Sequence, residues 1–113
     1  MSKFDEALES YKSTMADAGI ACDEALLTAV TKGLGPSIYN KDSSLVAGTD
    51  PEELARVKNN YLVGKLGLED SPELDEAVAS VMKTLGAAGV KMKPRAIVYY
   101  LLCKHFNKEG FYA

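Results

Sequence analysis

Hydrophobic positions recur at helical spacing in five segments of this chain. Within each segment an apolar residue returns every three or four positions, which is typical of one buried face of an amphipathic helix. The expected helices cover residues 4–18, 24–32, 51–66, 72–85 and 94–107. Apolar and polar residues never alternate for long enough to predict a strand. The pattern therefore predicts an all-α fold, a compact single-domain bundle of about five helices over residues 1–113.

Residues that start and stop helices border these segments. Polar side chains that can accept a hydrogen bond from a free helix N–H precede four of them: Ser2, Asp23, Asp50 and Ser71. A proline, which needs no N–H partner at a first helical position, opens three of them: Pro51, Pro72 and Pro94. Glycines, which readily adopt the left-handed conformation of a helix end, follow four of them: Gly19, Gly33, Gly67 and Gly86.

The least regular stretch, residues 33–49, follows the second expected helix. Its apolar residues predict a packed Gly/Pro connector with a short helical turn. Long connections in small domains often carry function, and the candidates here are Gly35, Pro36, Ser37, Tyr39 and Asn40. The stretch is not a phosphate-binding loop, because Pro36 lacks an N–H donor and no Gly-Lys-Ser/Thr sequence follows.

The fifth expected helix differs from the others because residues 96–103 are apolar on every face. A helix that is apolar all round must be buried all round. It is therefore either the central helix of the bundle, which we favour, or the core of a subunit interface. Tyr99 and Tyr100 lie inside this run, and we expect them in the core with their hydroxyls hydrogen-bonded.

The composition, with 47% hydrophobic and 26% charged among 113 residues, is that of one soluble globular domain. The net charge of −3 argues against a protein whose whole surface binds nucleic acid. The charge is uneven, however. Residues 1–30 carry two basic and six acidic side chains, whereas residues 87–113 carry a single acidic residue and five basic ones: Lys91, Lys93, Arg95, Lys104 and Lys108. This basic segment either docks on the acidic N-terminal half, within or between subunits, or binds an anion or nucleic acid.

Two cysteines, Cys22 and Cys103, do not make a disulfide framework. The start of the chain lacks the apolar stretch of a secretory signal, and the longest fully apolar run is too short to span a membrane. We therefore expect a cytoplasmic protein with no membrane partner and two free thiols, each buried or half-buried.

Catalytic chemistry has weak candidates. His105 is the single histidine, and Cys103 lies about 200° away from it around a helix, so the two side chains cannot form a dyad. Asp23 and Glu24 beside Cys22 disfavour a reactive thiolate. The other acidic residues lie mostly at helix starts, where the helix dipole explains them. We predict no catalytic residue.

Metal chemistry is equally weak. Asn40, Asp42 and Ser44 have the spacing of the first ligands of a calcium loop, but Leu45 and Pro51 stand where that loop needs glycine and glutamate. We expect neither a metal site nor a cofactor.

Several segments together resemble a known family. They are residues 4–6, 23–27, 32–40, 57–62, 65–68 and 95–102, and the most specific is Lys-Gly-Leu-Gly-Pro-Ser-Ile-Tyr-Asn at residues 32–40. The chain is similar to an uncharacterised family of short bacterial cytoplasmic proteins, a domain of unknown function. The resemblance implies an all-helical fold and a bacterial source, and it transfers no catalytic or binding residue.

Three hypotheses of function follow. The first is a small non-enzymatic protein-interaction module that self-associates as a homodimer through the fifth helix or the Gly/Pro connector. The second is an anion-binding or nucleic-acid-binding protein that uses the basic segment. The third is an enzyme of unknown type that uses Cys22 or His105.

Overall fold

The computed structural model describes residues 3–39, 44–46, 50–90 and 93–112, and most of them are helical. The α-helices are α1 (Lys3–Asp17), α2 (Glu24–Leu34), α4 (Pro51–Val57), α5 (Pro72–Ala87) and α6 (Arg95–His105). Shorter helical segments are the 3₁₀ turns η1 (Gly35–Tyr39) and η3 (Glu109–Tyr112) and the π-helical η2 (Lys58–Val63). Two strands, β1 (Leu45–Val46) and β2 (Lys93–Pro94), complete the fold. The predicted all-α class is confirmed.

Side-chain caps fix the starts of α2 and α4, whereas Ser71, the predicted cap of α5, makes no side-chain cap hydrogen bond. The Asp23 carboxylate accepts a hydrogen bond from the N–H of Leu26 at 3.2 Å, and that of Asp50 accepts one from Glu52 at 3.0 Å. Pro51 and Pro72 occupy the first positions of α4 and α5, as predicted. Ser2, the expected cap of the first helix, lies outside the described residues.

Two helix ends lie slightly beyond their predicted glycines. α2 continues through Gly33 and ends at Gly35, and α5 continues through Gly86. At these two ends Gly35 (65°) and Gly89 (85°) adopt positive φ, and the predicted Gly19 and Gly67 do so as well, each at 72°. A glycine inside a helix costs only about 1 kcal/mol, so packing decides which of two nearby glycines ends the helix.

The third expected helix is split, which the periodic pattern did not indicate. After Val57 the hydrogen bonds lengthen by one residue: the N–H of Gly64 donates to Asn59, and that of Leu66 donates to Tyr61. Such π-helical turns insert an extra residue into a helix. In this turn two consecutive side chains, Tyr61 and Leu62, are both fully buried.

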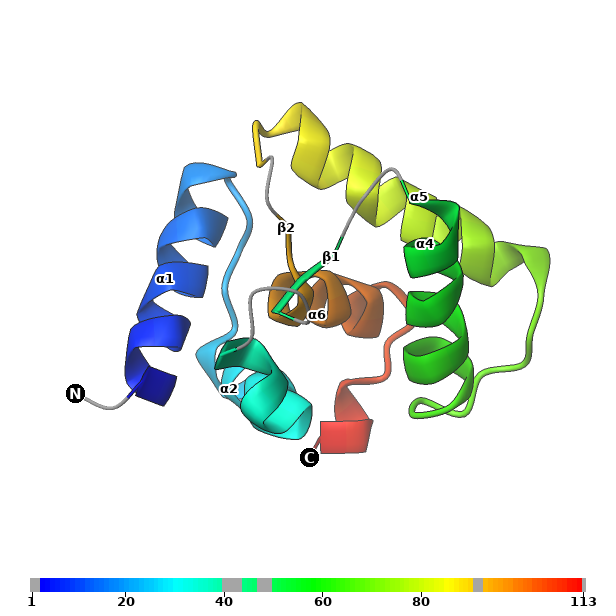
Figure 1. The fold of residues 1–113 in the computed structure, drawn as a ribbon, viewed down its shortest axis with the longest axis horizontal. Helices are drawn as coiled ribbons and strands as arrows, with labels where there is room; N and C mark the ends of the chain where they lie inside the picture. Colours follow the sequence, from blue (N-terminus) through cyan, green and yellow to red (C-terminus); the bar gives the residue numbers. More distant parts are fainter. Residues whose placement is uncertain (1–2, 40–43, 47–49, 91–92, 113) are drawn as a thin grey trace.

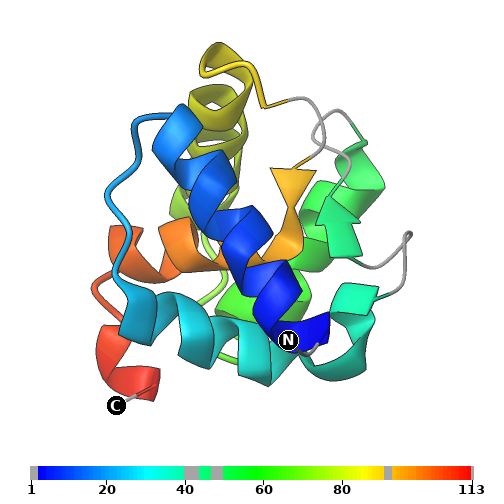
Figure 2. The same cartoon turned by 90° about the vertical axis from the view of Figure 1, so that its left-hand side faces the viewer.

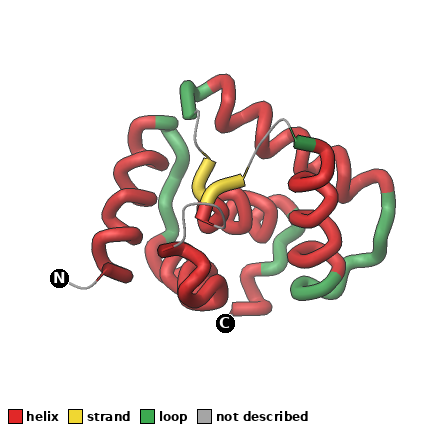
Figure 3. The backbone as a smooth tube through the Cα atoms, in the orientation of Figure 1, coloured by secondary structure: helices red, strands yellow, loops and turns green. Residues whose placement is uncertain are grey.

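The two short strands also depart from the prediction of no strand. They pair antiparallel, with Leu45 opposite Pro94 and Val46 opposite Lys93. Each strand has two residues, so neither can show an alternating pattern, and the partners are far apart in sequence. Figure 3 shows the pair at the start of α6, which follows β2 directly.

α6 is the central helix. Figure 1 shows it between α1 and α2 on one side and α4 and α5 on the other, and the quarter-turned view shows α1 crossing obliquely in front (Figure 2). Its buried residues join those of all the other α-helices in one hydrophobic core. This confirms the central position predicted from the apolar run. Leu101 is the one residue of that run that is only half-buried.

Among helices in the described ranges, none combines the length and the hydropathy needed to cross a bilayer.

Candidate functional site

The basic residues of the C-terminal segment do not form one surface. Lys93 lies half-buried in β2, and Arg95 is the first residue of α6. Lys104 is exposed in the last turn of the same helix, about 14 Å further along its axis, and Lys108 follows, half-buried. Lys91 lies outside the described residues. The structure thus places these cations at opposite ends of the central helix.

Arg95 is engaged inside the fold. Its guanidinium forms an ion pair with Glu53, whose residue is only 8% exposed, and Arg56 holds the other oxygen of that carboxylate at 2.7 Å. Arg95 also donates to the Tyr99 hydroxyl and to the Leu45 carbonyl, each at 3.3 Å. Burial acts to lower the pKa of Arg95, but the hydrogen bonds to Tyr99 and Glu53 outweigh it and raise the pKa.

This ion pair joins α6 to α4, and so it lies outside the acidic segment of residues 1–30 on which the basic end was expected to dock. The helix dipole alone does not explain Glu53, because its carboxylate neutralises a half-buried cation in another helix. Nothing in the local sequence distinguishes Glu53 from Glu52, which is exposed.

The tyrosines of α6 are core residues with bound hydroxyls, as predicted. The Tyr100 hydroxyl donates to the Ala21 carbonyl at 3.0 Å and accepts from the Asp23 N–H at 2.8 Å. Tyr99 stacks on Tyr61 with ring centroids 3.9 Å apart. Neither ring is free to stack on a nucleic-acid base.

The connector after α2 is packed, with Ile38 buried in the turn η1. Gly35 has positive φ, and its N–H donates to the Lys32 carbonyl. Pro36 and Ser37 continue the same 3₁₀ turn, and Tyr39 at its end is 50% exposed. Asn40, the remaining candidate of the connector, lies outside the described residues.

The motif at residues 32–40 also serves as a junction. The Lys65 ammonium donates to the Gly33 carbonyl at 3.2 Å, and a Cβ at Gly33 would lie 2.7 Å from that nitrogen and 3.7 Å from the Tyr112 ring. Because the Lys65 side chain is flexible and 3.7 Å is an ordinary contact, these interactions join the end of α2 to Lys65 and η3 without requiring a glycine at residue 33. The described part of the motif therefore has an evident structural role.

The two thiols differ. Cys103 is fully buried, as expected, but Cys22 is exposed, so the expectation of a buried or half-buried side chain is wrong for Cys22. The buried Tyr100 is hydrogen-bonded to the backbone on both sides of Cys22. The side chain of Cys22 faces solvent. Burial and then Glu24 raise the pKa of Cys22, with a further contribution from Asp23, and this disfavours the thiolate.

A groove lies between α5 and α6. It consists of two adjoining hollows of about 430 and 320 Å³ that share Ser80 and His105. We call it the α5–α6 groove. Its lining residues are Glu73, Glu76, Ala77, Ser80, Val81, Thr84, Leu101, Lys104, His105 and Phe106.

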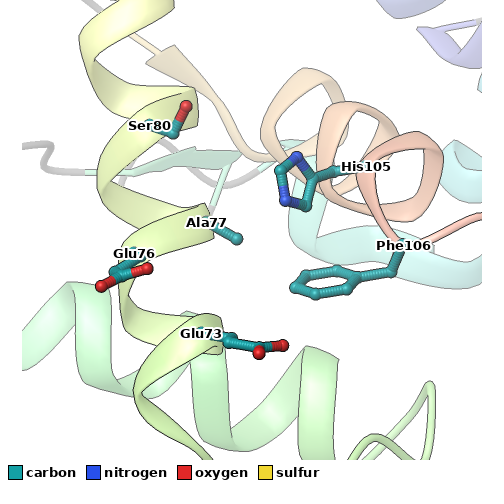
Figure 4. Close-up of a pocket in the computed structure, with 6 residues that line it drawn as sticks. All are labelled: Glu73, Glu76, Ala77, Ser80, His105 and Phe106. Carbon is teal, nitrogen blue, oxygen red and sulfur yellow. The ribbon is translucent and has the colours of Figure 1, made fainter.

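Figure 4 shows how one hollow of this groove is lined. His105 and Phe106 extend from the end of α6 toward α5, where Ala77 and Glu73 face them, while Glu76 extends away. The two rings of α6 meet edge to face with centroids 4.9 Å apart. In the described part of the chain, this ring contact is the interaction His105 makes, and no carboxylate or hydroxyl is hydrogen-bonded to it.

The α5–α6 groove has opposite charges at its two ends. Glu73 and Glu76 lie at the Phe106 end, and an adjoining hollow beyond it adds Glu69. Lys104 lies at the other end, beside Leu101. The half-buried Leu101 contributes apolar surface between them.

The sequence contained one signal for this groove. Leu101, Lys104 and His105 share one face of α6 at helical spacing, and they interrupt a helix that is otherwise covered. The matching face of α5 could not be singled out, because all exposed helix faces are polar. For a metal centre, no cluster of three or more His, Cys, Asp or Glu side chains converges within the described ranges.

Comparison with known proteins gives one match. The model of a family described as "Protein of unknown function (DUF2853)" matches residues 9–110 of the chain, which is nearly its whole length. No curated protein matches the chain.

Proposed function

We propose that this chain, which belongs to the DUF2853 family of proteins of unknown function, is a non-enzymatic protein-interaction module. The observation that carries the proposal is the α5–α6 groove, where the central helix is left open along Leu101, Lys104 and His105. The occupant is a segment of protein, because the groove follows α5 from Glu73 to Thr84, about 16 Å or three helical turns.

The lining supports a protein segment as occupant. Ser80 and Thr84 are small, exposed and one turn apart on α5, so a partner backbone can approach closely there. Phe106 and Leu101 supply apolar contacts in the groove, and charged side chains lie toward its ends. Protein interfaces combine such apolar contacts with polar and charged side chains around them.

A photoreactive residue in the groove tests this proposal. p-Benzoylphenylalanine at Ser80, in the middle of the groove, is expected to crosslink to protein in cells that produce the chain. The same residue at Ser13, an exposed serine of α1, is the matched control. Adding Thr84→Arg, which fills one end of the groove, should reduce the crosslink from Ser80.

Mass spectrometry identifies the captured protein. Equal crosslinking from both serines, none from Ser80, or no effect of Thr84→Arg would show that the groove is not a docking surface.

The enzyme hypothesis has less support. Cys22 has a raised pKa, and among the described residues the His105 ring meets the Phe106 ring, with no carboxylate or thiol hydrogen-bonded to it. We also place the protein in the cytoplasm, where its free thiols Cys22 and Cys103 would stay reduced.

Binding of an anion or nucleic acid stays a prediction. Arg95 is already neutralised by Glu53, so Lys104 and Lys108 would carry the binding at one end of α6. RNA affinity that falls steeply with salt and weakens in a Lys104→Ala, Lys108→Ala variant would establish it.

A further inference from the structure

We propose that the occupant of the α5–α6 groove is a second copy of this chain, packed antiparallel to the first across a twofold axis near Ser80 and His105. This inference rests on the proposed function and names the partner of the same groove. It moves the site of self-association away from the interior of α6, which the fold of one copy already covers.

The charge distribution favours a second copy. The acidic end of the groove carries Glu73, which faces its interior, and Glu76 on its outer rim, with Glu69 beyond them, and the basic end carries Lys104. A twofold axis through the middle of the groove places the acidic end of each copy on the basic end of the other. Every such contact then occurs twice, and both repeats are attractive. A parallel arrangement would instead bring like charges together.

The residues near the proposed axis suit close packing. Ser80 is small and exposed, and so is Thr84 one turn further along α5, whereas Ala77 is buried and faces the rings of His105 and Phe106. Two copies can therefore approach α5 to α5, with the rings of each copy bordering the contact. Leu101 is half-buried in this groove, whereas the other residues of the apolar run 96–103 are buried. Such packing would cover the exposed part of Leu101.

Charge reversal provides the experiment. Sedimentation velocity at about 100 µM protein and about 50 mM salt should show a dimer for the unaltered chain. Lys104→Glu and Glu76→Lys should each raise the dissociation constant about tenfold or more, because each reversal acts twice in the dimer. Glu76 is the fifth residue of α5 and Lys104 is exposed, so neither reversal should disturb folding.

Matched controls have the same charge changes elsewhere. Lys32→Glu alters an exposed lysine in the last turn of α2, and Glu6→Lys alters an exposed glutamate in the first turn of α1. Both controls should dimerise like the unaltered chain. Circular dichroism should show that all four variants remain helical.

Mixing the two groove variants gives the decisive measurement. In a Lys104→Glu chain paired with a Glu76→Lys chain, both contacts again join opposite charges. The mixture should therefore form a 1:1 heterodimer, although each variant alone is monomeric. A single chain that carries both reversals should regain its homodimer for the same reason.

The inference would be overturned if the unaltered chain were a monomer under these conditions. It would also be overturned if neither charge reversal changed the dissociation constant, or if the mixture of the two variants stayed monomeric. Any of these three results would still leave the proposed function testable. In that case the crosslink from Ser80 should join this chain to a protein other than a second copy of itself. Failure of the proposed function instead appears as equal or absent crosslinking from Ser80 and Ser13.

Discussion

A carboxylate is costly to bury unless a cation and hydrogen bonds compensate for the lost water. Glu53 meets this condition with two arginines, one from its own helix and one from α6. The two differ in exposure, since the side chain of Arg95 is 15% exposed and that of Arg56 is 57% exposed. Solvent screens the exposed partner more strongly, so Arg95 carries more of the compensation.

Arg95→Met is therefore expected to lower the free energy of unfolding by about 3 kcal/mol, because it leaves Glu53 with its screened partner. Arg56→Met, at the exposed position, should cost less than about 1 kcal/mol. Urea unfolding followed by circular dichroism measures both. Combining Arg95→Met with Glu53→Leu should restore much of the loss, because no buried charge then remains. Equal losses in the single and the combined variant would contradict this assignment.

Buried tyrosine hydroxyls predict a sensitivity to alkaline pH. Burial raises the pKa of Tyr61 well above its ordinary value, and the hydrogen bond to Tyr112, with the two oxygens 2.9 Å apart, adds to it. Burial likewise raises the pKa values of Tyr112 and Tyr11. Their neutral forms stabilise the fold fully below about pH 10, where the unfolded chain also keeps these protons.

As the pH rises above about 10, the unfolded state loses these protons first. Each such tyrosine then lowers stability by about 1.4 kcal/mol per pH unit. Tyr61→Phe should therefore be less stable than the unaltered chain at pH 8, and the difference should shrink above pH 10. Urea unfolding together with tyrosinate absorbance gives both quantities. Ionisation of Tyr61 in the folded chain near its ordinary pKa would contradict the prediction.

At the scale of elements, the sequence predicts what local chemistry determines. Asp23 and Asp50 cap α2 and α4 through contacts with residues two or three positions away, and these contacts depend on no other part of the fold. The π-helical turn at Tyr61 and the strand pairing of Leu45 with Pro94 depend on distant partners. Hydrophobic periodicity cannot predict the π-helical turn or the strand pairing, because it does not specify which distant segment will pack against a given one.

Tyr100 ties the central helix to the link between α1 and α2. Its hydroxyl is hydrogen-bonded on both sides, to Ala21 and Asp23, so Tyr100→Phe leaves a backbone donor and acceptor without this partner. We expect a loss of about 1–2 kcal/mol in the free energy of unfolding and faster hydrogen exchange at the Asp23 amide. Tyr39→Phe, at a half-exposed position, should change neither. If the Asp23 amide exchanged its hydrogen at the same rate in Tyr100→Phe as in the unaltered chain, the hydrogen bonds of the Tyr100 hydroxyl would not contribute to stability.

For the whole molecule, the apolar run of residues 96–103 was the most informative feature of the sequence. It predicted the central helix, because no other arrangement covers every face within one copy. The basic residues around it were less informative, since Arg95 and Lys104 share a charge but face different surroundings. A groove forms where two helices leave side chains uncovered, and this depends on packing that the sequence pattern does not specify.

The core is not equally protected throughout, and the two thiols can measure this. Cys103 is fully buried but lies near η3, because its carbonyl accepts a hydrogen bond at 2.9 Å from the N–H of Lys108, the residue before η3. η3 has no buried residue of its own. The hydrogen bond of Tyr112 to Tyr61 attaches this segment to the core. We infer that η3 opens more readily than the bundle unfolds.

A disulfide reagent should therefore modify the native protein in two phases. Cys22, which is exposed, should react first, and Cys103 should follow at a rate set by the opening of η3. At low urea the slow phase should change little with urea, because a local opening exposes little surface. Tyr112→Ala removes the attachment to Tyr61 and should speed the slow phase about tenfold, the equivalent of one hydrogen bond. If the slow phase instead follows the urea dependence of global unfolding and ignores Tyr112→Ala, then η3 and the bundle open together, and Cys103 reports the stability of the entire fold.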